Sequence, residues 1–96
     1  MAEFDRQRVV SDIHGVLKGL LFTETEVFYF HLENLGVSRD EILDSPDKFV
    51  RTLRDIFGNG SSLIETAIIA EMSRGLNVEA KEDLAGMLRF LGEKSV

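Results

Sequence analysis

The feature that most constrains the fold of this chain is the recurrence of apolar residues at spacings of three and four positions. In each segment with this spacing, the apolar side chains would lie on one face of an α-helix. Residues that cap helices precede these segments and glycines follow them, so the pattern also predicts where the helices begin and end. It predicts an all-α fold: a compact bundle of five main helices and one short helix, forming a single domain over residues 1–96.

The first two predicted helices occupy the N-terminal third of the chain. One covers residues 5–21, and the next runs from the Thr23-Glu24-Thr25-Glu26 capping box to Leu35, with Gly36 as its stop. Within the second, the Val-Phe-Tyr-Phe run at 27–30 would also suit a β-strand, because β-branched and aromatic residues favour strands. The capping box and the glycine favour the helix.

Four more helices are predicted from Ser38 onward. A capping box at 38–41 opens a short helix that ends near residue 44, and Pro46 begins a helix that Gly58 ends. Ser62 and Glu65 form a third capping box, which opens a helix over 62–74 that stops at Gly75. Asn77 is the expected cap of the last helix, whose apolar arc runs from Val78 to Leu91 and which Gly92 stops.

The segment at 62–74 differs from the others because apolar residues cover well over half of the circumference of its helix. These residues are Leu63, Ile64, Ala67, Ile68, Ile69, Ala70 and Met72. A helix that is apolar nearly all round is typical of the interior of a bundle. We therefore expect the helix at 62–74 to be the central element.

The composition excludes several classes of site. Seventeen acidic residues against eleven basic ones give a formal net charge of −6, which disfavours a general affinity for nucleic acid. The chain has no cysteine, so disulfides, thiolate zinc sites and cysteine nucleophiles are excluded. Its apolar runs are too short to span a membrane, and the first five residues have no signal-peptide pattern. A cytoplasmic protein is expected.

No catalytic or metal-binding constellation appears in the sequence. His14 and His31 lie on different predicted helices, and neither has the spacing of a metal-ligand motif. His31 falls within the apolar arc of its helix, which predicts a histidine at the edge of the core with one hydrogen bond. His14 lies at the polar edge of the first helix. The sequence predicts no enzyme activity, no metal and no cofactor.

Glu71 stands out as an acidic residue within the apolar arc of the helix at 62–74. A buried carboxylate must be paired with a cation or must take up a proton, and Arg6 and Lys81 are possible partners. One interpretation of Glu71 is a structural ion pair. The functional interpretation is a polar contact in a subunit interface.

Two phenylalanines depart from the apolar stripes of their helices. Phe30 lies away from the main stripe of the second helix, and Phe90 lies on the polar face of the last one. Each either covers a neighbouring segment or belongs to an exposed apolar patch, which would mark a contact surface. Gly15 and Gly19, four residues apart on the polar side of the first helix, would permit another helix to approach closely.

A basic face offers an alternative function. Lys48, Arg51 and Arg54 lie on one side of the Pro46 helix, with Asp47 and Asp55 among them. The mixed charges are typical of a solvated surface rather than of a phosphate-binding one. A nucleic-acid-associated regulator that uses the three cations is therefore the alternative hypothesis.

The run from Leu35 to Phe49, with its short helix before Pro46, is followed by Leu-Arg-Asp-Ile-Phe-Gly-Asn-Gly at 53–60 and Leu-Ile-Glu at 63–65. These segments resemble a family of small archaeal domains, the fifth Nitrosopumilus output domain family, and the resemblance covers residues 8–92. It implies an all-helical domain, stand-alone or fused to signalling modules, with an output role. It supplies no catalytic residues.

These observations predict a non-enzymatic helical protein-interaction module that acts as a signalling or regulatory output domain and as a homodimer. The predicted contact residues are Phe30, Phe90 and Glu71. The expected partner is another protein or a second copy of the chain, with no membrane involved and nucleic acid disfavoured.

Overall fold

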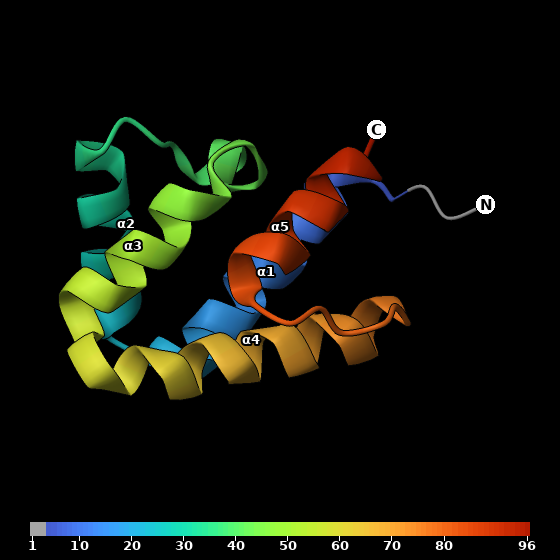
Figure 1. Cartoon of the computed structure of the whole chain (residues 1–96). Coiled ribbons are helices and arrows are strands. Elements are labelled where there is room, and N and C mark those ends of the chain that lie inside the picture. The colour runs from blue at the N-terminus through green and yellow to red at the C-terminus, as the bar shows by residue number, and fades with distance from the viewer. Residues whose placement is uncertain (1–3) are drawn as a thin grey trace.

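The computed structural model describes residues 4–96; residues 1–3, which belong to the stretch searched for a signal peptide, lie outside the described residues. The five α-helices are α1 (Arg6–Leu21), α2 (Glu24–Asn34), α3 (Pro46–Phe57), α4 (Ser61–Leu76) and α5 (Leu84–Glu93) (Figure 1). Two 3-10 helices are η1 (Arg39–Asp44) and η2 (Gly58–Gly60). The predicted all-α bundle of five main helices and one short helix is confirmed, and residues 27–30 are helical.

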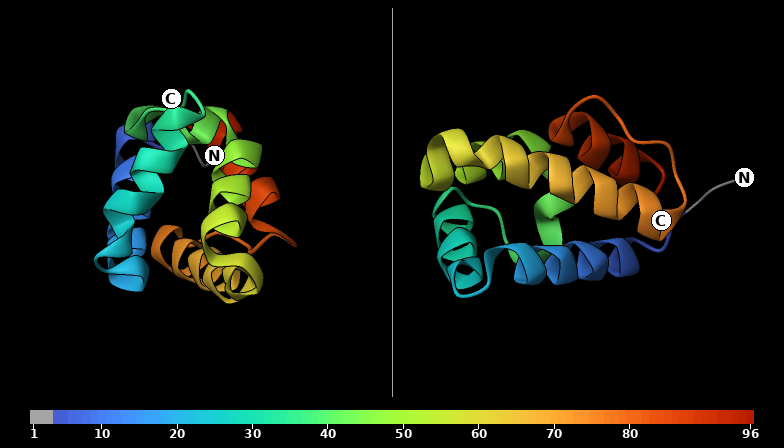
Figure 2. Two further views of the ribbon diagram at one scale, coloured as in Figure 1. Left: turned by 90° about the vertical axis from the view of Figure 1, so that its left-hand side faces the viewer. Right: turned by 90° about the horizontal axis from the view of Figure 1, so that it is seen from below.

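The helices form two layers, which the right-hand view of Figure 2 separates. α1 and α2 lie in one layer, and α3, α4 and α5 lie in the other. Across the layers, α1 packs against α4 and α2 packs against α3. Phe28 of α2 makes edge-to-face contacts with Tyr29 and Phe49, with ring centroids 5.4 and 5.0 Å apart. All three rings are buried, so this aromatic cluster joins the two layers.

The position of α4 corrects the expectation of a central helix. α4 contacts α1, α3 and α5, but it runs along one edge of the molecule (Figure 1). Its buried residues are Ser61, Glu65, Ile68 and Met72, whereas Leu63 is 78% exposed. The broad apolar arc predicted the wrong position for this helix. The face of α4 that is buried includes a serine and a glutamate, and part of the apolar arc is exposed to solvent.

The boundary between the last two helices also differs from the prediction. Asn77 does not cap the last helix; it adopts the left-handed conformation at the C-terminal end of α4 (φ 56°, ψ 50°), which asparagine tolerates better than most residues. α5 begins later, where the Asp83 carboxylate accepts a hydrogen bond of 2.7 Å from the Gly86 N–H. Gly75 and Gly92 lie within helices and do not stop them.

Of the three predicted capping boxes, the structure forms one. The Ser38 N–H and hydroxyl donate to Glu41 Oε1 at 3.2 and 2.9 Å, which fixes the start of η1. Thr23 makes no side-chain capping bond, and α4 begins one residue before Ser62. The predicted glycine stops after α2 and α3 are confirmed, since Gly36 and Gly58 both have positive φ (86° and 55°).

The two ends of the described chain are hydrogen-bonded to each other. The Phe4 N–H donates to the Lys94 carbonyl and the Val96 N–H donates to the Phe4 carbonyl, both at 2.9 Å. The Arg6 N–H donates to the Val96 carbonyl at 3.2 Å. These bonds place the start of α1 against the segment that follows α5.

Candidate interaction surface

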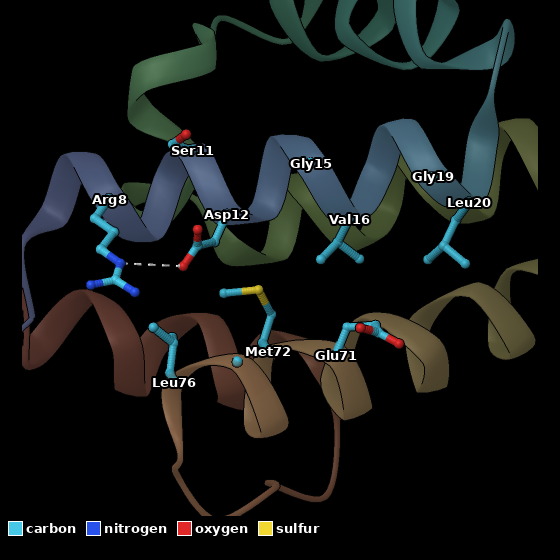
Figure 3. Close-up of a pocket in the computed structure, with 11 residues that line it drawn as sticks. Arg8, Ser11, Asp12, Gly15, Val16, Gly19, Leu20, Glu71, Met72 and Leu76 are labelled. Carbon is cyan, nitrogen blue, oxygen red and sulfur yellow. Dashed lines mark ion pairs between the residues drawn. The ribbon is translucent and has the colours of Figure 1, made fainter.

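A groove of about 610 Å³ runs between α1 and α4. The two helices run in opposite directions, so Arg8 and Leu76 lie at one end of the groove and Leu20 lies at the other (Figure 3). Its apolar lining consists of Val16, Leu20, Met72 and Leu76. We call this surface the α1–α4 groove.

Three glycines keep the α1–α4 groove open. Gly15, Gly19 and Gly75 line it, and a Cβ atom added at any of them would find no other heavy atom within 4 Å. No helix in residues 4–96 therefore makes the close approach that Gly15 and Gly19 would permit. A glycine inside a helix lowers helix stability relative to alanine, so these positions cost the single chain free energy without improving its packing.

The charged residues of the groove are paired within their own helices. Arg8 Nε lies 3.9 Å from Asp12 Oδ2, a long ion pair on α1 (Figure 3). On α4, Glu71 is exposed and is hydrogen-bonded to Arg74. The expectation that Glu71 is buried is therefore wrong, although Glu71 does line the α1–α4 groove.

The buried carboxylate of α4 is Glu65, which the sequence had assigned to a capping box. Its residue is 9% exposed, and its two carboxylate oxygens accept hydrogen bonds from Nε and Nη2 of Arg54, each at 3.2 Å. The partners suggested for Glu71 are engaged elsewhere: Arg6 forms an ion pair with Asp44 at 2.7 Å, and Lys81 Nζ lies 4.2 Å from the centroid of the Phe90 ring. The buried face of α4 passes through Glu65 and not through Glu71, so the face that is buried lies on a different side of the helix from the predicted one.

The structure places the two predicted phenylalanines differently. Phe30 is 63% exposed, and Val27 on the same helix is also exposed. Phe90 is half-buried, packs against the core and lies beneath Lys81, so it is not part of an exposed apolar patch. α2 and α5 lie apart in Figure 1, and the two rings do not share a surface with each other.

The basic face of α3 has a partner for each of its cations. Lys48 Nζ donates to the Leu35 carbonyl at 3.1 Å, and Arg51 Nε lies 3.7 Å from the carboxylate of Asp55. Arg54 is held by the buried carboxylate described above. A phosphate would have to compete with these contacts, which does not favour this face as a nucleic-acid site.

A polar cluster that the sequence did not predict joins α1, α2 and η1. His14 Nδ1 is hydrogen-bonded to the hydroxyl of Tyr29, and the guanidinium carbon of Arg39 lies 4.2 Å from the centroid of the Tyr29 ring. Burial raises the pKa of the Tyr29 phenol, so the phenol stays neutral. His31, the histidine expected at the edge of the core, is exposed instead, because the buried face of α2 lies on its other side.

This cluster predicts a pH dependence of stability. Burial lowers the pKa of His14 and the positive charge of Arg39 lowers it further, while Asp40 raises it. The unfolded chain therefore binds a proton more readily than the folded chain just below pH ~6.5, the ordinary histidine value, and the free energy of unfolding should decrease as the pH falls from about 7 to about 5.5. Urea unfolding across this interval should show a smaller decrease for His14→Gln than for the wild-type chain. Equal decreases in the free energy of unfolding of the two proteins would contradict the assignment of this pH dependence to His14.

The chain was compared with known proteins, and no family model, no curated protein and no solved structure matches it. Within residues 4–96, no three His, Cys, Asp or Glu side chains gather as a potential metal site. None of the helices in this part of the chain is both long and apolar enough to cross a membrane.

Proposed function

We propose that this chain is a non-enzymatic protein-interaction module whose contact surface is the α1–α4 groove. The observation that carries the proposal is the groove itself, a channel between two helices with both apolar and charged side chains along it, which three glycines leave unfilled. Grooves of this kind accept one face of a partner helix, with apolar side chains as anchors. A signalling or regulatory role for the module rests on the resemblance to the archaeal output-domain family.

The proposal is tested by measuring whether protein binding is lost when a side chain is placed in the α1–α4 groove. Gly15→Gln places a side chain in the groove, where its Cβ meets no heavy atom of a neighbouring element within 4 Å, and Thr66→Gln places the same side chain on an exposed position of α4 outside the groove. The wild-type chain and the Thr66→Gln variant should bind a protein, either another copy of the chain in light scattering or a different protein captured on a column. Gly15→Gln should lose that binding.

Two results would overturn the proposal. One is the absence of any protein association up to millimolar concentration. The other is association that Gly15→Gln leaves unchanged, because the contact surface would then lie elsewhere. Far-ultraviolet circular dichroism of both variants checks that the helices are intact.

A further inference from the structure

We infer that the turn between α1 and α2 is a hinge at which two copies of this chain exchange α1. When the hinge opens, α1 and α2 become one continuous helix over residues 6–34, and α1 of each copy takes the place of α1 in the other. The inference goes beyond the proposed function, because the exchange re-forms the α1–α4 groove rather than filling it. It is carried by the backbone of Phe22, by the helical register across the turn and by the contacts of α1.

The turn between α1 and α2 departs from helical geometry at a single residue. Phe22 has φ 52° and ψ −120°, whereas Thr23 already has helical angles of φ −68° and ψ −20°. The chain turns sharply at this point, as the right-hand view of Figure 2 shows. The Phe22 N–H still donates to the Lys18 carbonyl at 3.1 Å, which is the bond that continues α1. Rotation of the Phe22 backbone to helical angles is therefore sufficient to join the two helices.

Phe22 is poorly suited to the closed turn. Its angles are close to those of the first central position of a type II′ turn, which glycine favours, and Gly58 has nearly the same angles after α3 (φ 55°, ψ −128°). The other residues with positive φ in residues 4–96 are Gly36 and Asn77, which tolerate this conformation. Phe22 is also 75% exposed, so burial of its ring does not offset the backbone strain. The continuous helix removes this strain.

The sequence around the hinge is compatible with a continuous helix. Residues 20–35 contain neither glycine nor proline, the two residues that most disfavour a helix interior. Thr23 makes no side-chain capping bond at the start of α2, so its hydroxyl does not satisfy the N–H groups of that first turn. In the continuous helix, the carbonyls at the end of α1 accept hydrogen bonds from these N–H groups.

The buried face of α1 continues in helical register into the buried face of α2. Its members are three or four residues apart throughout, so a continuous helix places them in one stripe. These residues are Val10, Ile13, Leu17, Leu21, Thr25, Phe28 and Leu32. The open form therefore keeps one buried face, whose α1 half packs on the second copy while its α2 half stays against its own α3.

The contacts of α1 identify a second copy of this chain as the partner. α1 packs against α4 and η1, Arg6 forms an ion pair with Asp44 at 2.7 Å, and His14 is hydrogen-bonded to Tyr29. Each contact joins a residue before Phe22 to a residue after it, so each re-forms between two chains when α1 is exchanged. The site that α1 vacates is complementary to α1 itself, and short hinges under strain favour such an exchange.

The decisive experiment compares alanine with glycine at the hinge. Each full chain is refolded from urea at millimolar concentration, and its molar mass is measured by size-exclusion chromatography with light scattering. We expect the wild-type chain to yield a dimer that persists after dilution, because α1 must leave its site before monomers can form. Phe22→Ala should increase the dimer fraction and Phe22→Gly should abolish it, because alanine favours the helix and glycine favours the positive φ of the closed turn.

The size of the difference follows from symmetry. After equilibration in dilute urea, the dimer dissociation constants of Phe22→Ala and Phe22→Gly should differ by at least about a hundredfold, because each dimer contains two hinges. Both variants remove the same aromatic ring, so loss of a contact made by the ring cannot produce this difference. Thermal unfolding of Phe22→Gly should show a higher midpoint than that of the wild-type monomer, which excludes misfolding as the reason for its failure to dimerise.

A distance measurement distinguishes exchange of α1 from two closed chains that lie side by side. The chain has no cysteine, so nitroxide labels can be attached at Ser11→Cys and Glu33→Cys, two exposed positions on α1 and α2. In a continuous helix these positions are about 33 Å apart, at about 1.5 Å per residue. Pulsed electron spin resonance on labelled chains diluted with unlabelled chains should give this distance in the dimer and a shorter one in the monomer.

Three results would overturn the inference. They are the absence of a dimer from both the wild-type chain and Phe22→Ala, equal dimer fractions for Phe22→Ala and Phe22→Gly, and a dimer that keeps the Ser11–Glu33 distance of the monomer. The proposed function is tested separately, because Phe22→Gly keeps the hinge closed and the α1–α4 groove intact. Binding by Phe22→Gly that Gly15→Gln blocks would support the groove whether or not α1 is exchanged.

Discussion

Phe49→Ala should remove about 3–5 kcal/mol from the free energy of unfolding, because truncation of a fully buried phenylalanine loses its transfer free energy and leaves a cavity. Phe49 is 0% exposed and lies edge-to-face against Phe28 at 5.0 Å between ring centroids, so the two layers lose their aromatic contact. Since domains of this size are stable by only about 5–15 kcal/mol, the variant should unfold at much lower urea concentration.

The matched control for Phe49→Ala is Phe30→Ala. Phe30 has the same side chain on an exposed surface of α2, so its truncation should change the free energy of unfolding by less than about 0.5 kcal/mol. Equal losses in the two variants would show that the aromatic cluster is not at the centre of the core. Urea unfolding of both proteins, followed by circular dichroism, provides the comparison.

Gly92→Val should also destabilise the chain strongly. We expect its free energy of unfolding to fall by about 1–3 kcal/mol because of overpacking. A Cβ atom at Gly92 would lie 3.1 Å from the Leu43 carbonyl oxygen and 3.6 Å from the Leu43 Cβ. These atoms belong to η1, whose start is fixed by its capping box, so α5 would have to move away from it.

The control for Gly92→Val is a substitution at a helical glycine against which no other element of the chain packs. Gly15→Ala meets no other heavy atom within 4 Å and should stabilise the chain by about 0.5–1 kcal/mol through helix propensity alone. Urea unfolding should therefore give changes of opposite sign for the two glycines. A stabilising Gly92→Val variant would mean that η1 and α5 do not pack closely at this point.

Local signals in the sequence were sufficient to predict that the five α-helices exist, but not all of their ends or the faces that they bury. The capping box at Ser38 and the glycine stops at Gly36 and Gly58 involve neighbouring residues, so their chemistry can be predicted from spacing. Gly92 looked like a further stop for the same reason. Its actual role is to let α5 approach Leu43, a residue far away in sequence, and no local pattern reveals that contact.

The candidate site also combines features that the sequence reveals with contacts that only the packing of the helices determines. The spacing of Gly15 and Gly19 could be noticed in the sequence, but whether a helix of the chain already covers them depends on the packing of α1 against α4. The contact between His14 and Tyr29 joins residues 15 positions apart on different helices, and the ion pair of Glu65 with Arg54 joins α4 to α3. Apolar periodicity does not report such polar contacts, because a buried carboxylate and a capping carboxylate look alike in a sequence.

The hydrogen bonds between Phe4 and the segment after α5 have a consequence for synthesis. On the ribosome, α1 is made before the carbonyl of Lys94 and the N–H of Val96 that are hydrogen-bonded near its start. Met87, Leu88 and Leu91 of α5 are also made after the other four α-helices, so the apolar core stays incomplete until α5 has been made. Folding of this domain therefore cannot finish before α5 leaves the ribosome, and a pause in translation before α5 would expose the unfinished core to chaperones.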